Sequence, residues 1–248
     1  MRKKSSLILC GIALFFAVPL FSFAQIREGN YLTSLFNQQG GAELFANVDE
    51  LKKTQRFSVL ANVQAISPVS KRSIIERADK ELAKPWPLLT LSQFNEFKLT
   101  GNRSGYEGNY FARRSKLTHL VIGEVVERKG RYLSEIVDGL GLVLEESSWA
   151  LPAHMYLQKA GDGLPDIEEP VIDLFVAQTA MVLAWTRFLL ADELDSYSPQ
   201  LLARMDRELA NRVFNPYLQR DDFWWMGFNK KRMNNWNIYV NTNVLIAA

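Results

Sequence analysis

The sequence predicts an all-α protein, and three observations lead to that prediction. Apolar residues recur at intervals of three and four in several segments, and capping residues, glycine or proline bound those segments. The alternation of apolar and polar residues that is typical of strands is almost absent. One long segment is apolar on nearly every face while its neighbours are amphipathic, so we expect antiparallel helical hairpins in two layers, as in an α/α toroid or solenoid.

The first predicted helix covers residues 70–84. It begins at the capping residue Ser70 and stops before a Pro-Trp-Pro run. Two further segments, 115–129 and 132–144, are separated by Gly130, and we expect them to form a helical hairpin.

The most apolar segment is expected to be helical from the acidic pair at Glu168 through Leu194, with Pro170 in its first turn. Its polar residues would be costly in lipid, so the sequence favours a helix buried among other helices over a membrane span. A last amphipathic helix is predicted to open at Ser198 and to end before Pro216.

The N-terminus has the pattern of a secretory signal peptide. Three basic residues precede an apolar run from Leu7 to Phe23, and small residues permit cleavage after Ala24. We therefore assign residues 1–24 to a signal peptide and expect a periplasmic or secreted protein. An uncleaved anchor is the alternative.

The composition of the remaining chain narrows the function. Removing residues 1–24 takes three of the 29 basic residues and none of the 27 acidic residues, so the formal charge changes from +2 to −1. This near-neutral balance argues against a nucleic-acid partner. The only cysteine leaves with the signal peptide, so packing rather than disulfides must stabilise the fold.

The last residues, from Asn243 to Ala248, read as the first turns of another apolar helix without the charge, glycine or proline that commonly ends one. We therefore expect residues 25–248 to be the N-terminal part of a longer toroid. The sequence does not indicate an oligomeric state.

The stretch 221–243 gathers three tryptophans and several asparagines. Trp224, Trp225 and Trp236 offer flat faces on which sugar rings can stack, and Arg232 can donate hydrogen bonds to sugar hydroxyls. Core packing is the alternative for any single tryptophan. We interpret the stretch as one wall of a glycan-binding cleft.

Asn235 and Asn237 are the candidate catalytic residues. β-Elimination from a uronate requires removal of the proton next to a carboxylate, and a neutral amide can stabilise the negative charge that develops on that carboxylate. Capping a helix or holding a turn is the commoner role of asparagine and remains the alternative.

His154 follows Pro-Ala in a loop close to Trp149, and both side chains are candidate substrate contacts. His154 is also a candidate acid or base. No metal-ligand spacing and no nucleotide-binding or hydrolase motif is present, so no metal and no cofactor is expected. Paired carboxylates are the other device that cleaves sugars. The candidate pairs are Glu145 with Glu146, Asp166 with Glu168, and Asp221 with Asp222.

Several segments together resemble the heparinase II/III-like proteins of bacterial polysaccharide-degrading systems, over a span from about residue 50 to the last residue. The segments are PWPLLTLSQFNEFKLTGNRSGYE, EESSWALPAH, LPDIEEPVIDLFVAQTAMVLAWTRFLLADELD and DDFWWMGF followed by NNWN. The resemblance implies an N-terminal α/α toroid, a following β-sandwich domain, and lyase activity on acidic polysaccharides.

The resemblance also implies roles for individual residues. In related toroidal lyases an asparagine at a site like NNW neutralises the uronate carboxyl group, and a tyrosine and a histidine supply base and acid. Asn235, beside Trp236, is the best match for that asparagine, and Asn237 is the second. In the family the tyrosine and the essential histidine generally come from later positions, and the β-sandwich has no counterpart in this sequence. We therefore expect the chain alone not to turn over substrate.

The leading hypothesis is the N-terminal part of a secreted lyase that cleaves a uronate-containing polysaccharide by β-elimination. A non-catalytic helical glycan-binding protein and a toroidal glycoside hydrolase with paired carboxylates are the two alternatives. After removal of the signal peptide, an acidic polysaccharide is the expected partner and a membrane is not.

Overall fold

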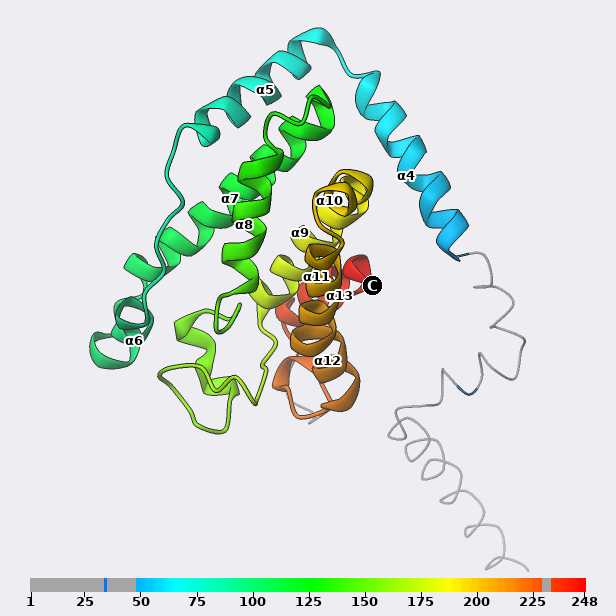
Figure 1. The fold of residues 1–248 in the computed structure, drawn as a ribbon. Coiled ribbons are helices and arrows are strands. Elements are labelled where there is room, and N and C mark those ends of the chain that lie inside the picture. The colour runs from blue at the N-terminus through cyan, green and yellow to red at the C-terminus, as the bar shows by residue number, and fades with distance from the viewer. Residues whose placement is uncertain (1–33, 35–47, 229–232) are drawn as a thin grey trace, which may run out of the picture. The chain divides into compact units, whose positions relative to one another are not determined.

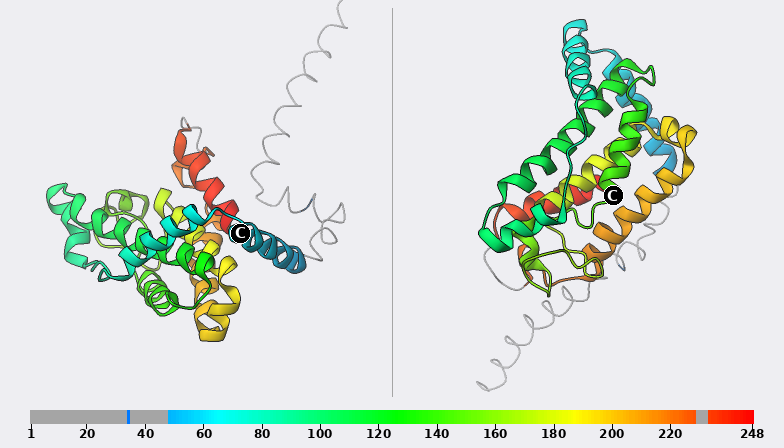
Figure 2. Two further views of the ribbon diagram at one scale, coloured as in Figure 1. Left: turned by 90° about the horizontal axis from the view of Figure 1, so that it is seen from above. Right: turned by 60° about the vertical axis from the view of Figure 1, so that its left-hand side comes forward.

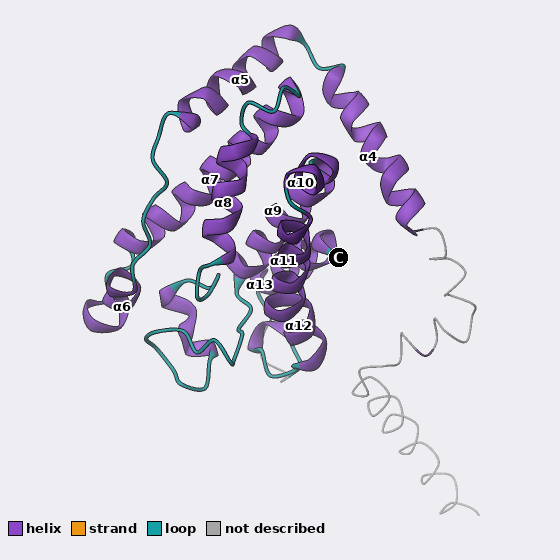
Figure 3. Cartoon of the chain, viewed as in Figure 1, coloured by secondary structure: helices purple, strands orange, loops and turns teal. Residues whose placement is uncertain are grey.

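The computed structural model describes Ser34 and residues 48–228 and 233–248 (Figure 1). All regular elements in these residues are helical, and Figure 3 shows helices and loops without a strand in the described part of the chain. The predicted all-α fold class is confirmed. The signal peptide assigned to residues 1–24 lies outside the described residues.

The chain divides into two compact units, residues 1–55 and residues 56–248. The first helix, α4 (Val48–Gln64), supplies most of what is described in the first unit. The second unit holds the candidate functional residues. After α4 its elements are α5 (Pro68–Leu82), α6 (Leu91–Thr100), α7 (Ser104–Glu127), α8 (Leu133–Leu144), η1 (Pro152–Leu157), α9 (Leu174–Leu189), α10 (Ala191–Tyr197), α11 (Pro199–Leu209), η2 (Ala210–Phe214), α12 (Asn215–Gln219), η3 (Trp224–Met226) and α13 (Asn235–Ala247).

Capping chemistry sets where the early helices begin. Helix α5 starts before the predicted Ser70, because the hydroxyl of Ser67 accepts the Ser70 N–H at 3.1 Å and Pro68 fits the first turn. Helix α6 was not predicted. It opens with a capping box in which Thr90 and Gln93 exchange hydrogen bonds.

Helix α7 begins at Ser104, well before the predicted start at residue 115. Its first turns include two glycines, which weaken a helix. The same turns bury Tyr106 and Tyr110, which lie one above the other on one face of the helix. Tertiary packing therefore overrides the low helix propensity of this stretch. Gly130, at φ 73°, then turns the chain into α8 as the predicted hairpin requires.

Helix α9 begins at Leu174 rather than at Glu168, because Asp173 caps it. It ends at Leu189, and after the capping residue Leu190 helix α10 departs at 83°. Within the described ranges no single helix is long and apolar enough to cross a membrane, whereas the bent pair α9 and α10 together has the required length and composition.

The helix predicted to end before Pro216 continues through that residue. After α11 the chain makes one π-helical turn, η2, in which the Asn215 N–H bonds to the Ala210 carbonyl, and α12 follows with Pro216 in its first turn. A proline has no N–H to donate, and the wider turn removes the clash that a proline would make inside an α-helix.

Helix α9 is central to the second unit. It packs against α7, α10, α11 and α13, and Figure 2 shows α13 lying alongside it. Fully buried apolar side chains such as Leu120, Ile136, Leu140 and Leu183 fill the core, and each contributes about 1.5–3 kcal/mol to folding.

Glycines allow the closest helix approaches. A Cβ atom on Gly123 of α7 would lie 2.5 Å from the Ala78 Cβ of α5, and a Cβ atom on Gly139 of α8 would lie 2.3 Å from a ring carbon of Trp86. Both distances are shorter than any normal contact. Close packing, rather than a special backbone conformation, therefore restricts these two positions to glycine.

We expect Gly139→Ala to lower the free energy of unfolding by about 1–3 kcal/mol, because the new methyl group collides with the Trp86 ring. The matched control is Gly141→Ala in the same helix, where an added Cβ meets no atom within 4 Å. That control should be neutral, or stabilising by up to about 1 kcal/mol. Urea unfolding curves measure both variants, and equal effects would contradict the packing described.

Candidate functional site

The site is organised by the buried carboxylate of Asp173, whose side chain is fully shielded from solvent. Its Oδ1 accepts the N–H groups of Phe175 and Val176 at 2.8 and 2.7 Å, which caps helix α9. Its Oδ2 accepts the Leu151 N–H at 3.1 Å and faces His154 Nδ1 at 2.6 Å. One side chain therefore joins the start of α9 to the short helix η1.

This contact fixes the orientation of His154. A carboxylate can only accept hydrogen bonds, so Nδ1 carries the hydrogen, and the lone pair of a neutral imidazole then lies on Nε2. The ring lies parallel to Phe175, with centroids 6.0 Å apart, and meets the Trp236 ring edge-on at 4.8 Å. Nε2 has no hydrogen-bond partner among the described residues. The imidazole is held at one end and unpaired at the other, with 12% of its side chain exposed.

Two more aromatic side chains, Trp224 and Tyr156, extend this surface. Trp224 lies 5.1 Å from Trp236 between ring centroids and donates its Nε1–H to the Tyr156 hydroxyl at 3.2 Å. Tyr156 is 48% exposed, so its phenol can meet a ligand. We call the set His154, Tyr156, Trp224, Asn235 and Trp236 the His154 surface.

The amides at the start of α13 divide into different roles. Asn234 caps the helix, since its Oδ1 accepts the Trp236 N–H at 2.9 Å. Asn237 points its amide nitrogen at the carbonyls of Trp225 and Met226, at 3.0 and 3.4 Å. Asn235 is exposed and has no hydrogen bond to another described residue.

The proposed catalytic role of Asn237 is therefore corrected. Its amide nitrogen donates to these main-chain oxygens, so this donor is directed into the protein rather than toward a substrate carboxylate. It ties α13 to the η3 turn instead. Asn235 is the amide that remains available, a distinction that the sequence left open.

Two tryptophans predicted to contact substrate lie in the core. Trp225 is fully buried, stacks with Phe223 and donates its Nε1–H to the Ile172 carbonyl at 2.9 Å. Trp149 is 1% exposed and donates to the Val143 carbonyl at 2.9 Å. Trp225 therefore presents no face on which a sugar could stack, and that prediction is wrong. Trp149 lies outside the His154 surface and lines the separate cavity described below, and Arg232 lies outside the described residues.

Sequence reasoning missed Asp173, Tyr156 and Phe175 as site residues. An aspartate directly before a long apolar helix is a recognisable cap, but the acidic pair and proline upstream directed the predicted start to Glu168. Nothing local indicated that His154 and Trp236, far apart in the chain, would meet.

A buried ionic network lies behind the site. Glu146 is clamped by Arg113 at 2.9 Å and by Arg114 at 2.7 Å, and all three side chains are at most 10% exposed. Arg114 also lies over the Tyr110 ring, and burial raises the pKa of Tyr110 so that its phenol stays a donor, here to the Trp149 carbonyl at 2.7 Å. The network positions the chain that leads from α8 to η1.

Two of the three carboxylate pairs predicted from sequence have a member that is engaged by arginine. Glu146 serves the two arginines, and the Arg220 guanidinium bonds Asp222 and lowers the pKa of that carboxyl. Among the residues that the structure describes, no group of three or more histidine, cysteine, aspartate or glutamate side chains could hold a metal ion.

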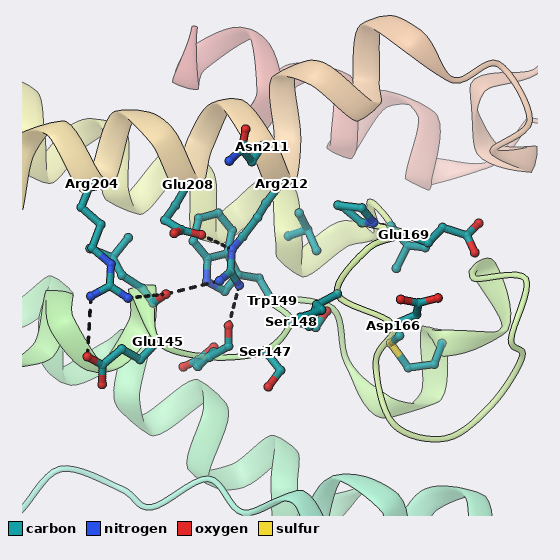
Figure 4. A pocket seen from close by; sticks show the side chains of 17 residues that line it. Glu145, Ser147, Ser148, Trp149, Asp166, Glu169, Arg204, Glu208, Asn211 and Arg212 are labelled. Atoms are coloured by element: carbon teal, nitrogen blue, oxygen red, sulfur yellow. Dashed lines mark hydrogen bonds and ion pairs between the residues drawn. The ribbon is translucent and has the colours of Figure 1, made fainter.

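A separate cavity of about 440 Å³ lies between the Glu145–Trp149 segment, the loop 166–171 and the α11–η2 run (Figure 4). Met155 of η1 reaches it, whereas no member of the His154 surface lines it. The chain therefore offers an aromatic surface around His154 and, apart from it, a partly open cavity with a mixed polar and apolar lining.

Comparison with known proteins identifies no relative. No protein-family profile matches the chain, and no curated protein sequence matches it. The site has to be interpreted from its own geometry.

We expect Asp173→Ala to lower the free energy of unfolding by about 3–5 kcal/mol, because it leaves buried N–H groups of Leu151, Phe175 and Val176 without an acceptor. Asp173→Asn keeps an acceptor for α9 and should cost less, about 1–3 kcal/mol. Asp206→Asn, at a half-exposed ion pair with Arg187, is the control and should cost less than about 1 kcal/mol. Equal losses in the three variants would contradict the organising role of Asp173.

Proposed function

We propose that the His154 surface contacts an acidic polysaccharide in a secreted or periplasmic lyase of the heparinase II/III-like type, which cleaves next to a uronate by β-elimination. The observation that supports this most is the meeting of two distant segments. A histidine held by a buried aspartate lies against Trp236, the tryptophan that directly follows the unpaired amide of Asn235. The α/α toroid is part of the same proposal, and the helical pairs of the second unit are compatible with it.

The aromatic members of the surface provide the sugar contacts. The apolar C–H faces of a pyranose ring pack against indole rings, and Trp224 and Trp236 are only partly buried. The Tyr156 hydroxyl accepts one hydrogen bond from Trp224 and keeps its own hydrogen for a sugar oxygen. These contacts would hold one or two units of the polymer at His154.

Asn235 is the proposed partner of the uronate carboxylate. Removing the C5 proton places negative charge on that carboxylate, and a neutral amide donor stabilises this charge without titrating itself. The N-terminus of α13 adds to the effect, since its partial positive charge favours an anion near the first turn.

His154 is the proposed proton carrier. Its Nε2 takes the C5 proton, the C5 electron pair forms the double bond to C4, and the C4–O bond breaks. The imidazolium, stabilised through Nδ1 by Asp173, then returns a proton to the leaving oxygen. Each cleavage leaves one unsaturated uronate end and one new hydroxyl end, with no co-reactant.

Affinity for matched uronate oligosaccharides tests the recognition step. We expect an oligogalacturonate to bind more tightly than its methyl ester, because only the free acid offers a carboxylate to Asn235. Asn235→Ala should weaken binding of the acid by roughly tenfold and leave binding of the ester unchanged, since a hydrogen bond to a charged group contributes about 1.5–3 kcal/mol. Calorimetric titration measures both ligands.

The matched control is Asn215→Ala, an exposed asparagine of α12 away from this surface. It should bind both ligands like the unaltered protein. Failure of Asn235→Ala to reduce the preference for the acid would contradict the assigned role of Asn235.

A second measurement tests the chemistry. Near-ultraviolet absorbance of the unsaturated product is followed with uronate polymers, and we expect any turnover to fall at least a hundredfold in His154→Gln, consistent with loss of an acid–base group. Binding without product formation would support the alternative of a non-catalytic glycan-binding protein. New reducing ends without absorbance would instead indicate a hydrolase.

A further inference from the structure

The cavity beside the Glu145–Trp149 segment has the size of a small-ligand site. Its volume of about 440 Å³ falls in the range typical of ligand pockets, roughly 300–1,000 Å³. Its wall combines the apolar side chains of Met155, Ile167, Pro170 and Val171 with several polar groups. Such a mixed lining suits a ligand that has both C–H faces and hydroxyl groups.

The charges of the wall exclude an acidic ligand. Five carboxylates and two guanidinium groups line the cavity. Both guanidinium groups are already engaged: Arg212 bonds Glu208 at 2.6 Å and the Glu146 carbonyl at 2.6 Å, while Arg204 faces Glu145 at 3.6 Å. Each described arginine of the wall therefore already faces a carboxylate. Glu146 and Glu169 are in turn paired with arginines outside the wall, so Asp166 is the described wall carboxylate without an arginine partner, and it repels a uronate or a sulfate.

The groups that remain for a ligand are neutral or accepting. The side chains of Asn211 and Ser147 make no hydrogen bond to another described residue, and among these residues the Asp166 carboxylate accepts only the Glu168 N–H, at 2.9 Å. An amide, a hydroxyl and a carboxylate oxygen together can both donate to and accept from sugar hydroxyls. Figure 4 shows all three side chains at the cavity wall.

The backbone that carries Asn211 is itself unusual. Asn211 lies in the π-helical turn η2, and π turns inside helical runs are rare and frequently occur at functional sites. The same turn carries Arg212, whose guanidinium covers the Trp149 ring at 4.9 Å and bonds the Leu144–Glu146 main chain. The turn thus shapes one wall of the cavity and leaves Asn211 unpaired there.

We infer that this cavity is a second carbohydrate site, which binds one sugar unit that carries no acidic group. It differs from the His154 surface in its residues, its charge and the class of sugar it accepts. The inference does not depend on the reaction proposed for His154, since it concerns a separate binding event.

A panel of monosaccharides tests the inference. Glucose, galactose, mannose and N-acetylglucosamine, with glucuronate and galacturonate as acidic counterparts, are titrated into the purified protein and followed by saturation-transfer NMR. We expect at least one neutral sugar to bind. In an Asn235→Ala background, which removes the uronate contact proposed for the His154 surface, we expect the acidic counterpart to bind more weakly than that sugar. Asn211→Ala should lower the affinity for the neutral sugar by about fivefold or more, as loss of one or two hydrogen bonds predicts.

Asn215→Ala serves as the matched control, because it removes an exposed asparagine from the same helical run outside the cavity wall. It should leave the affinity unchanged. Absence of binding by every neutral sugar, equal binding of neutral and acidic sugars in the Asn235→Ala background, or equal affinities of Asn211→Ala and Asn215→Ala would each overturn the inference.

Discussion

The hydrogen bonds of one buried carboxylate, that of Asp173, set the geometry of the candidate site. This side chain caps α9, fixes the Leu151 backbone and orients the His154 ring. A fully buried charge is costly unless its lone pairs are satisfied, and four donors satisfy Asp173. The same bonds that stabilise the start of the central helix therefore also determine which nitrogen of His154 is available to a ligand.

A second buried charge, on Glu146, supports this arrangement from behind. Two arginines of α7 clamp its carboxylate, and the Arg212 guanidinium of η2 donates to the Glu146 main-chain carbonyl at 2.6 Å. The segment between α8 and η1 is thus fixed by α7 on one side and by η2 on the other. This fixed segment separates the two candidate binding regions, since it borders the cavity and leads directly into the helix that carries His154.

The sequence predicted the all-helical class because apolar periodicity and caps are local properties, and it located the helical hairpin around Gly130 for the same reason. It misplaced the starts of α7 and α9, since those depend on the packing of Tyr106 and Tyr110 and on the choice between Asp173 and an equally plausible acidic pair upstream. Composition identified the Trp- and Asn-rich stretch as a candidate binding region, but burial separates Trp224 and Trp236 from Trp225. Whether a tryptophan faces solvent or the core is a tertiary property that a single sequence does not encode locally.

The account depends most on the state of the His154 ring, and the chain has only two histidines, His119 and His154. A long-range proton–nitrogen correlation spectrum of the neutral rings, recorded at about pH 9 and assigned with a His119→Gln variant, reports which nitrogen carries the hydrogen. The account predicts that His154 is protonated on Nδ1 and that Nε2 is unprotonated. Protonation of Nε2 instead would contradict it, because Asp173 would then not hold the ring and the available nitrogen could not accept a proton.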